Sequence, residues 1–161
     1  MRNLKAKGFT LIELIVVIAI IGVLAAILVP SMMGFVKDSK YSTANSNAKL
    51  VHTNLCTYAT KAETAGYPIK AITGATTGKA IPARTSTLAA ITAQPDETAC
   101  LNALGYYMGT DTAGKAGYCS FTVVDGAPTK AWWAKTASDP IVGRYPDPTS
   151  ASDNPAVTFG A

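Results

Sequence analysis

The sequence has few of the side chains on which catalytic and metal sites usually depend. It contains one histidine, His52, and three cysteines, none of which forms a Cys-x-x-Cys pair. A single histidine offers no convincing Ser-His-Asp or Cys-His arrangement, and the sequence has neither a P-loop nor a dinucleotide-binding glycine motif. We therefore predict no enzymatic activity, no cofactor and no zinc site.

Charge is also scarce. Charged residues make up 15% of the 161 residues, and the formal net charge is +4. Without the three basic residues among the first eight positions, the basic and acidic side chains nearly balance; these three are Arg2, Lys5 and Lys7. Positive residues beside an apolar segment hold that end of a chain on the cytoplasmic side of a membrane. Because the positive excess belongs to these first residues and the rest of the chain is nearly neutral, the charge predicts no nucleic-acid partner.

The sequence does contain one long apolar run near its start. Residues Phe9 to Val29 are apolar except for Thr10 and Glu13, and Pro30 follows. As a helix this run would be about 30 Å long, which is the thickness of the hydrocarbon core of a bilayer. The pattern predicts a single membrane-spanning helix.

Neither an ordinary anchor nor a secretory signal explains Glu13. A carboxylate inside a membrane segment costs about 2.5–3.5 kcal/mol on insertion scales. A secretory signal is cleaved after its apolar core, but here the clean small-residue junction, Gly8–Phe9, precedes that core. Cleavage at this junction would leave the apolar run on the mature protein. It would also create a new amine at Phe9, one helical turn from Glu13.

The residues around this junction closely resemble the type IV pilin family. The chain reads Lys7-Gly8-Phe9-Thr10-Leu11-Ile12-Glu13-Leu14, which matches the family pattern of a basic leader ending in Gly, then Phe-Thr-Leu-Ile-Glu and an apolar helix. Gly22 and Pro30 also stand at the family's usual places. The resemblance implies that a prepilin peptidase cleaves after Gly8 and methylates the new amine of Phe9.

The same resemblance implies how the chain assembles. Glu13 would pair with the amine of Phe9 in a neighbouring subunit, and the apolar helices would form the core of a homo-oligomeric helical filament built on a pilus assembly platform. Gly22 and Pro30 both weaken a helix. We therefore expect unwound backbone between them in the filament and a nearly continuous helix in the isolated subunit. The chain would lie in the cytoplasmic membrane before assembly and on the cell surface afterwards.

These implications set the expected organisation and function. The parts are a cleaved leader at 1–8, a transmembrane and fibre-core helix at 9–30 and a globular head at 31–161 that includes the second half of the long helix. We expect a structural subunit of a type IV pilus for adhesion or motility. The alternative within the family is a pseudopilin of a type II secretion or DNA-uptake machine. A membrane-anchored enzyme or solute-binding domain would need convergent polar residues, and the sequence offers no candidate cluster.

The rest of the chain predicts a small α+β fold, with the long helix packed on an antiparallel sheet. Hydrophobic periodicity extends the helix from Phe9 to Glu63, and its amphipathic second half needs a partner surface. The further elements expected are a short helix at Gln94–Gly105, hairpin strands at Tyr118–Val124 and Lys130–Lys135 around a turn at 125–129, a third strand at Ile141–Tyr145, an edge strand at Ala156–Phe159, and extended pieces at Ile69–Ile72 and Leu88–Thr92.

The cysteine count favours one disulfide and one leftover thiol in an exported domain. Cys100–Cys119 is the favoured pair, because it closes a loop of about 20 residues and would stabilise the fold by about 3 kcal/mol. Cys56–Cys100 is the alternative, and three buried reduced cysteines are the third reading. The adjacent Trp132 and Trp133 point to opposite faces of a strand, so we expect one in the core and the other partly exposed.

Overall fold

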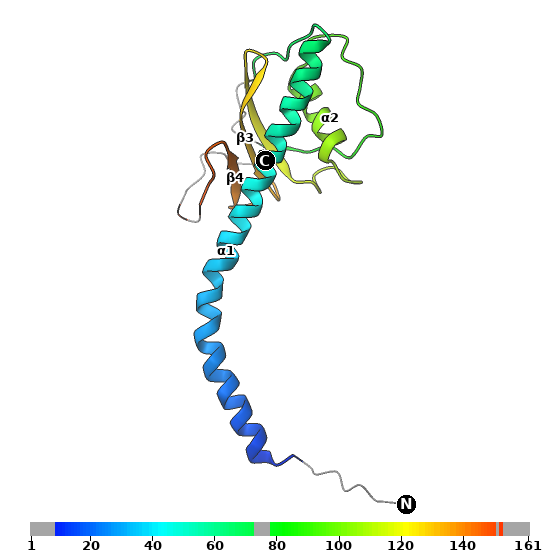
Figure 1. Ribbon diagram of the computed structural model, residues 1–161. Coiled ribbons are helices and arrows are strands. Elements are labelled where there is room, and N and C mark those ends of the chain that lie inside the picture. Colours follow the sequence, from blue (N-terminus) through cyan, green and yellow to red (C-terminus); the bar gives the residue numbers. More distant parts are fainter. Residues whose placement is uncertain (1–8, 73–77, 151, 153–161) are drawn as a thin grey trace, which may run out of the picture. The chain divides into compact units, whose positions relative to one another are not determined.

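The computed structural model describes residues 9–72, 78–150 and 152. The elements, in chain order, are α1 (Leu11–Thr64), β1 (Lys79–Ala80), α2 (Glu97–Met108), β2 (Tyr118–Val124), β3 (Ala127–Ala134) and β4 (Val142–Tyr145), drawn in Figure 1. The chain divides into two compact units, with the boundary in the sequence between Lys37 and Asp38. One long helix and one small antiparallel sheet confirm the expected α+β class.

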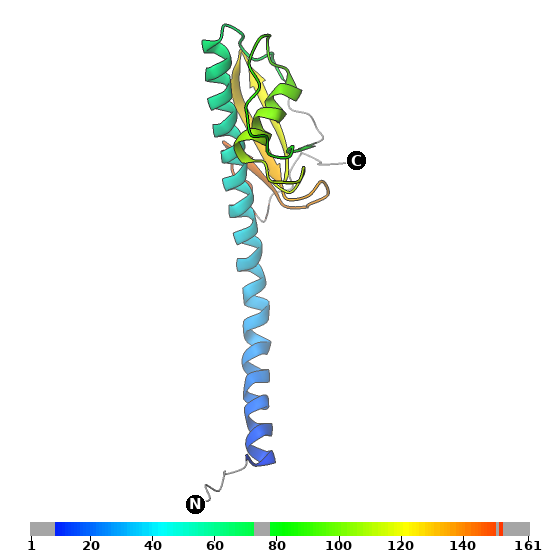
Figure 2. The same cartoon turned by 90° about the vertical axis from the view of Figure 1, so that its right-hand side faces the viewer.

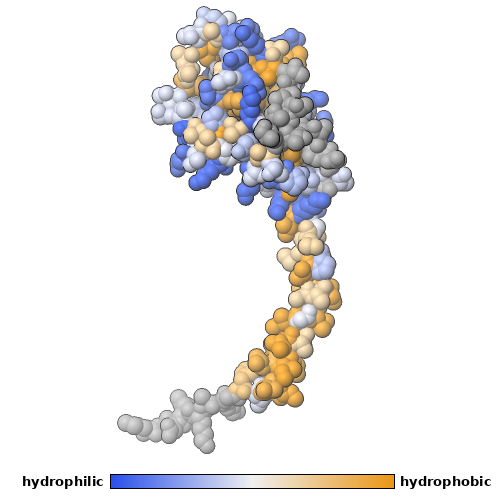
Figure 3. All heavy atoms as spheres, turned by 180° about the vertical axis from the view of Figure 1, so that it is seen from behind, coloured by the Kyte–Doolittle hydropathy of each residue, from blue (hydrophilic) through white to orange (hydrophobic). Residues whose placement is uncertain are grey.

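The first unit consists of the N-terminal part of α1. The helix is continuous through Gly22 and Pro30, as expected for the isolated subunit, and its observed bounds confirm the predicted long helix to within two residues. Every residue from Phe9 to Lys40 is exposed. In the face shown in Figure 3, hydrophobic residues cover most of this unit, whereas hydrophilic residues cover much of the second unit.

The second unit is built on a four-stranded antiparallel sheet in the order β1-β2-β3-β4. Residues paired across β2 and β3 point to the same face, and the pairs Cys119–Trp133 and Phe121–Ala131 lie on the buried face. The buried residues of α1 and α2 join these strand residues in one hydrophobic core. Figures 1 and 2 show the C-terminal half of α1 running alongside the sheet. The sheet is therefore the partner surface that the amphipathic half of α1 needs.

Two glycines permit close packing of backbone in this unit. A Cβ added to Gly143 of β4 would lie 2.0 Å from the carbonyl carbon of Ala44 in α1, so only glycine lets the strand approach the helix here. A Cβ added to Gly105 in α2 would lie 3.1 Å from Ala83 O and from Pro82 Cβ. Gly105 is thus a packing position within the helix, and the predicted helix end at this residue is wrong.

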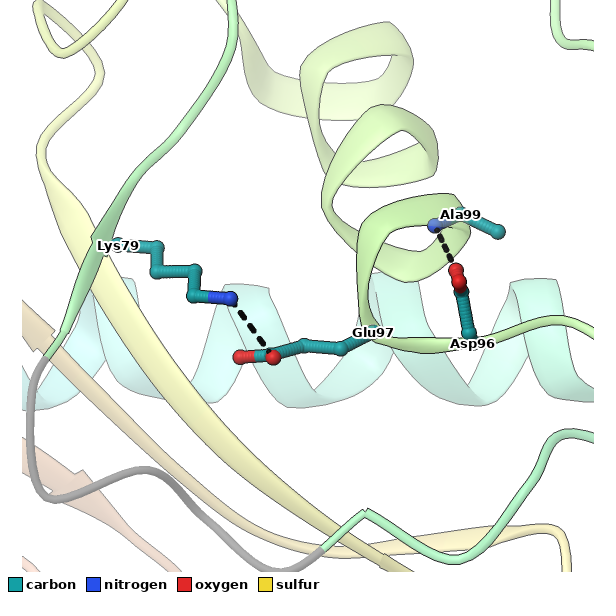
Figure 4. Close-up of polar contacts among 4 residues, drawn as sticks. All are labelled: Lys79, Asp96, Glu97 and Ala99. Atoms are coloured by element: carbon teal, nitrogen blue, oxygen red, sulfur yellow. Dashed lines mark hydrogen bonds and ion pairs between the residues drawn. The ribbon is translucent and has the colours of Figure 1, made fainter.

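The ends of α2 follow capping rules. Asp96 precedes the helix, and its Oδ1 accepts a hydrogen bond from the amide of Ala99 at 2.9 Å, as Figure 4 shows. This bond satisfies one of the amides that have no partner at a helix N-terminus. The helix ends at Met108, and the amide of Gly109 donates to the carbonyl of Gly105. The prediction placed the start correctly to within a few residues and the end one turn too early.

The hairpin was predicted correctly, with a longer second strand than expected. Asp125 and Gly126 both have positive φ, of 48° and 80°, which defines a two-residue hairpin turn. β3 therefore begins at Ala127, and Pro128 is accommodated at a register shift between Thr122 and Val123. β4 confirms the third strand.

The remaining predictions had mixed outcomes. Ile72 forms an isolated bridge with Val123, which supports part of the extended piece at Ile69–Ile72. Leu88–Thr92 is not a strand, and the two-residue strand β1 was not predicted. Ala156–Phe159 lies outside the part of the chain that the structure describes.

The two tryptophans lie as their spacing predicts. Trp133 is 9% exposed, and its Nε1 donates to the carbonyl of Ala116 at 2.8 Å. Trp132 is half-buried on the opposite face, where it packs against the small cluster of Ala134 and Val142. The buried indole therefore has the hydrogen-bond partner that a core tryptophan needs.

Candidate functional site at the start of the long helix

The first turn of α1 is closed by a reciprocal pair of side chains. Thr10 directly precedes the helix, and Glu13 Oε2 accepts hydrogen bonds from the amide of Thr10 at 2.9 Å and from its hydroxyl at 2.7 Å. The amide of Glu13 in turn reaches Thr10 Oγ1 at 3.4 Å. This arrangement is a capping box, in which a threonine and a glutamate three residues later satisfy orphan amides of the helix start.

The capping box gives Glu13 a partner within its own chain. The family resemblance implies only contacts between subunits for Glu13 and implies no role for Thr10. The signal that would have revealed this role was present in the sequence, because Thr-x-x-Glu before an apolar run is the typical capping-box pattern. The carboxylate therefore enters an apolar segment with two hydrogen bonds already made, which reduces the cost of leaving water.

The apolar surface of this unit has no partner among the described residues. α1 contains a stretch long and apolar enough to cross a membrane, it lies near the N-terminus, and none of it is buried by the chain itself. Exposed apolar side chains continue from Phe9, which is 79% exposed, to Val36. Because a surface of this kind is unfavourable in water, it requires lipid or other protein around it.

Gly22 and Pro30 lie within this apolar helix. A Cβ added to Gly22 would meet no atom within 4 Å, so packing in the subunit does not require glycine there. Pro30 sits inside the helix, and next to it Ser31 Oγ donates to the carbonyl of Leu28 at 2.9 Å. Their assigned role in assembly stays a prediction, as does the processing role of Phe9. Gly8 lies outside the described residues.

All three cysteines are free in this structure. Cys100 on α2 and Cys119 on β2 are buried in the same core, and burial raises the pKa of each thiol to about 12. Burial also raises the pKa of the half-buried Cys56. The disulfide Cys100–Cys119 and its alternative Cys56–Cys100 therefore stay predictions.

Cys56 and His52 do not form an activated thiol–imidazole pair. The sulfur lies 3.7 Å from Nδ1 and 4.0 Å from Nε2 of the imidazole. A sulfur in line with the Nδ1 lone pair would be much farther from Nε2, so the thiol packs over the ring face. His52 Nε2 instead contacts the carbonyl of Pro128 at 3.2 Å, and its ring packs on Tyr145. His52 thus fastens α1 to the sheet, and Cys56 packs against its ring.

Acidic side chains of the second unit serve structural roles. Figure 4 shows Glu97, at the start of α2, forming a 2.8 Å ion pair with Lys79 of β1. This contact holds the short edge strand against α2, although an exposed pair contributes little free energy. Across the described ranges, no group of three or more His, Cys, Asp or Glu side chains is arranged to hold a metal ion.

Comparison with known proteins gives matches to pilins and to a related secretion protein. Residues 3–29 match the family model of the prokaryotic N-terminal methylation motif. The chain is 51% identical over 51 residues to the type IV major pilin protein PilA of Myxococcus xanthus (strain DK1622), a match that covers 32% of this chain and 23% of that protein. It is 41% identical over 66 residues to the type IV major fimbrial protein FimA of Dichelobacter nodosus, covering 41% of this chain and 42% of that one.

A third relative belongs to a secretion machine. The chain is 37% identical over 68 residues to the type II secretion system core protein G of Pseudomonas aeruginosa, covering 42% of this chain and 46% of that protein. The chain thus spans less than half the length of each of these three relatives. No solved structure gives a significant match.

Proposed function

We propose that this chain is a type IV pilin and a structural subunit of a type IV pilus, because it carries the N-terminal methylation motif and its N-terminal part is similar to type IV pilins. The observation that carries this proposal is the exposed apolar helix that begins with the capped Glu13. Such a surface is compatible with a bilayer before assembly and with the helices of other copies afterwards. A role in structure rather than catalysis follows from this assignment.

The steps of assembly follow from the same residues. A prepilin peptidase cleaves between Gly8 and Phe9 and methylates the amine of Phe9. Residues 9–30 hold the subunit in the cytoplasmic membrane, and 31–161 form the head. On an assembly platform, Glu13 meets the amine of Phe9 from a neighbouring copy, and the helices pack into the core of a surface filament that serves adhesion or motility.

One specific observation favours a second function. The similarity to a type II secretion core protein G supports a pseudopilin, which would use the same N-terminal helix in a short fibre. The two functions differ in product, because a pilus is a long filament outside the cell made mainly of one chain.

Electron microscopy of sheared surface material, with intact mass of its main component, tests the proposal. We expect filaments composed of a chain that starts at Phe9 and carries one added methyl group. Gly8→Leu should abolish processing and filaments, because glycine leaves room that a larger side chain would fill, whereas Ala6→Leu, two residues upstream, should leave both intact. Filaments whose subunits retain residues 1–8 would contradict the proposal, and the absence of filaments from a correctly processed chain would favour the pseudopilin.

A further inference from the structure

The head contains a cavity that has no part in the proposed filament assembly. It has a volume of about 520 Å³ and lies between the loop 85–96, the first two turns of α2 and the side chain of Tyr58 on α1. This volume is within the range of small-molecule sites in proteins, about 300–1,000 Å³. We call it the loop pocket.

Tyr58 contributes a polar group to the wall of the loop pocket. The residue is 5% exposed and lines the pocket, and its hydroxyl is not among the fully buried polar atoms that lack a partner in the described part of the chain. A phenol hydroxyl can both donate and accept a hydrogen bond. Tyr58 therefore offers a bound molecule a hydrogen-bonding group.

Polar groups on α2 line the same space. Asp96 and Asn102 both border the pocket. Asp96 uses Oδ1 to cap α2, and its charge helps to raise the pKa of Tyr58, after burial and Cys100. The phenol is thus neutral over the physiological range, and a hydroxyl group placed in the pocket could accept from Tyr58 and donate to Asp96.

The composition of the pocket wall selects a class of ligand. No Lys, Arg or His lines the pocket, so an anion would find no counter-charge there, and the one carboxylate repels it. The remaining wall combines threonine hydroxyls and amides with aliphatic Leu88 and Ile91. Hydroxyls and amides match a molecule rich in hydroxyl groups, and the aliphatic side chains match its C–H surface.

We propose that the loop pocket binds a neutral monosaccharide unit, with Tyr58, Asp96 and Asn102 as its polar contacts. This site belongs to the head and does not depend on the proposed filament role. The full chain in detergent micelles, without assembly, is therefore the right sample, and a negative result leaves the pilus assignment standing.

Saturation-transfer NMR with D-galactose and N-acetyl-D-glucosamine, and with D-glucuronate as the charged counterpart, tests the proposal. We expect at least one neutral sugar to bind and glucuronate to bind at least tenfold more weakly. Tyr58→Phe and Asn102→Ala should each weaken binding of the neutral sugar roughly tenfold, since each removes one hydrogen-bonding group. Thr60→Ala, two residues from Tyr58 on the exposed face of α1, is the matched control and should bind as the wild type does.

Three results would overturn the proposal: no binding of either neutral sugar, equal binding of glucuronate, or unchanged binding in both pocket variants. Asn102 is exposed, so Asn102→Ala keeps the test valid if Tyr58→Phe disturbs the core. Circular dichroism of each variant checks that the head is folded.

Discussion

Glu13 and Thr10 hydrogen-bond to each other at the start of α1, with Glu13 Oε2 at 2.9 Å from the amide and 2.7 Å from the hydroxyl of Thr10. The carboxylate of Glu13 therefore already has hydrogen-bond partners within its own subunit. Assembly through the amine of Phe9 must therefore add to these bonds or replace them. Capping and charge pairing become separate roles of one side chain.

Two substitutions at Glu13 separate these roles. Glutamine also serves at this position of a capping box, so Glu13→Gln keeps the cap and removes the charge, whereas Glu13→Ala removes both. If the charge pairs with a neighbouring amine, both variants should accumulate in the membrane while surface filaments fall steeply. The reason is that removing one partner of a buried ion pair typically costs about 3–5 kcal/mol.

Filament yield by shearing, with intact mass to confirm cleavage after Gly8, provides the measurement. Thr10→Val serves as the matched control, since it loses the threonine hydroxyl of the cap and keeps the charge. Normal filament yield from correctly cleaved Glu13→Gln would show that capping, and not charge pairing, is the contribution of this residue.

The helix between Gly22 and Pro30 should differ between subunit and filament. In the isolated chain it is continuous, although Gly22 costs about 1 kcal/mol relative to alanine and Pro30 about 3 kcal/mol. We expect locally unwound backbone in this interval once the helices pack in a filament. A filament map by electron cryomicroscopy that shows unbroken α-helical hydrogen bonding from Gly22 to Val29 would rule this out.

Gly143→Ala should destabilise the head. The added methyl group would overlap the backbone of Ala44, and overpacking of this kind typically costs about 1–3 kcal/mol. Urea unfolding followed by the fluorescence of Trp132 and Trp133 measures the change. Gly34→Ala, where the methyl group meets no atom within 4 Å and alanine favours the helix, should not lower the midpoint. An equal fall in both variants would show that the close approach is unimportant.

Asn45 should fasten the chain after β4 to α1. Its Oδ1 accepts from the amide of Arg144 at 3.0 Å and from the amide of Thr149 at 3.1 Å, and its Nδ2 donates to the carbonyl of Thr149 at 2.7 Å. Asn45→Ala leaves these groups without partners, so we expect a loss of about 2 kcal/mol or more. Hydrogen exchange at Arg144 and Thr149 should accelerate together.

Asn54→Ala is the control for this prediction, since Asn54 lies on the same helix, is also half-buried and makes none of these bonds. Unchanged exchange at Thr149 in Asn45→Ala would mean that other contacts hold this segment.

The reduced head should lose stability at high pH. Burial raises the pKa of Cys100 and Cys119 from 9.0 to about 12, so the unfolded chain releases these protons at lower pH than the folded one. The stabilisation is complete below pH 9 and is lost as the pH rises towards 12. Chemical unfolding in reductant between pH 9 and about pH 12 should show a falling free energy of unfolding. Cys119→Ala should show a smaller fall. An identical pH dependence in the two proteins would contradict the prediction.

Oxidation should have a different effect on the same thiols. We expect a Cys100–Cys119 disulfide in surface material, where the environment is oxidising, with Cys56 left reduced. Peptide mapping without reductant decides between this pair and Cys56–Cys100. Three thiols that react with alkylating reagent in the unfolded, unreduced protein would reject both pairs.

Sequence reasoning succeeded where one local pattern determines the structure. Apolar periodicity predicted the long helix, and Asp125-Gly126 between β-branched strands predicted the hairpin. It failed where a residue has a role only through a distant partner. Gly105 resembles a helix stop, but its missing side chain lets Pro82 pack closely against α2. Asn45 resembles an ordinary surface residue, but it hydrogen-bonds to Thr149, 104 positions later in the chain. The loop pocket is equally invisible, because its walls come from three separate stretches.

Every buried residue among those the structure describes lies at Tyr41 or beyond. Substitutions in the head can therefore accumulate without disturbing the packing of the apolar helix, and changes in that helix leave the head core intact. The two parts are free to evolve under separate constraints, one imposed by identical neighbours and the other by whatever the surface of the filament meets.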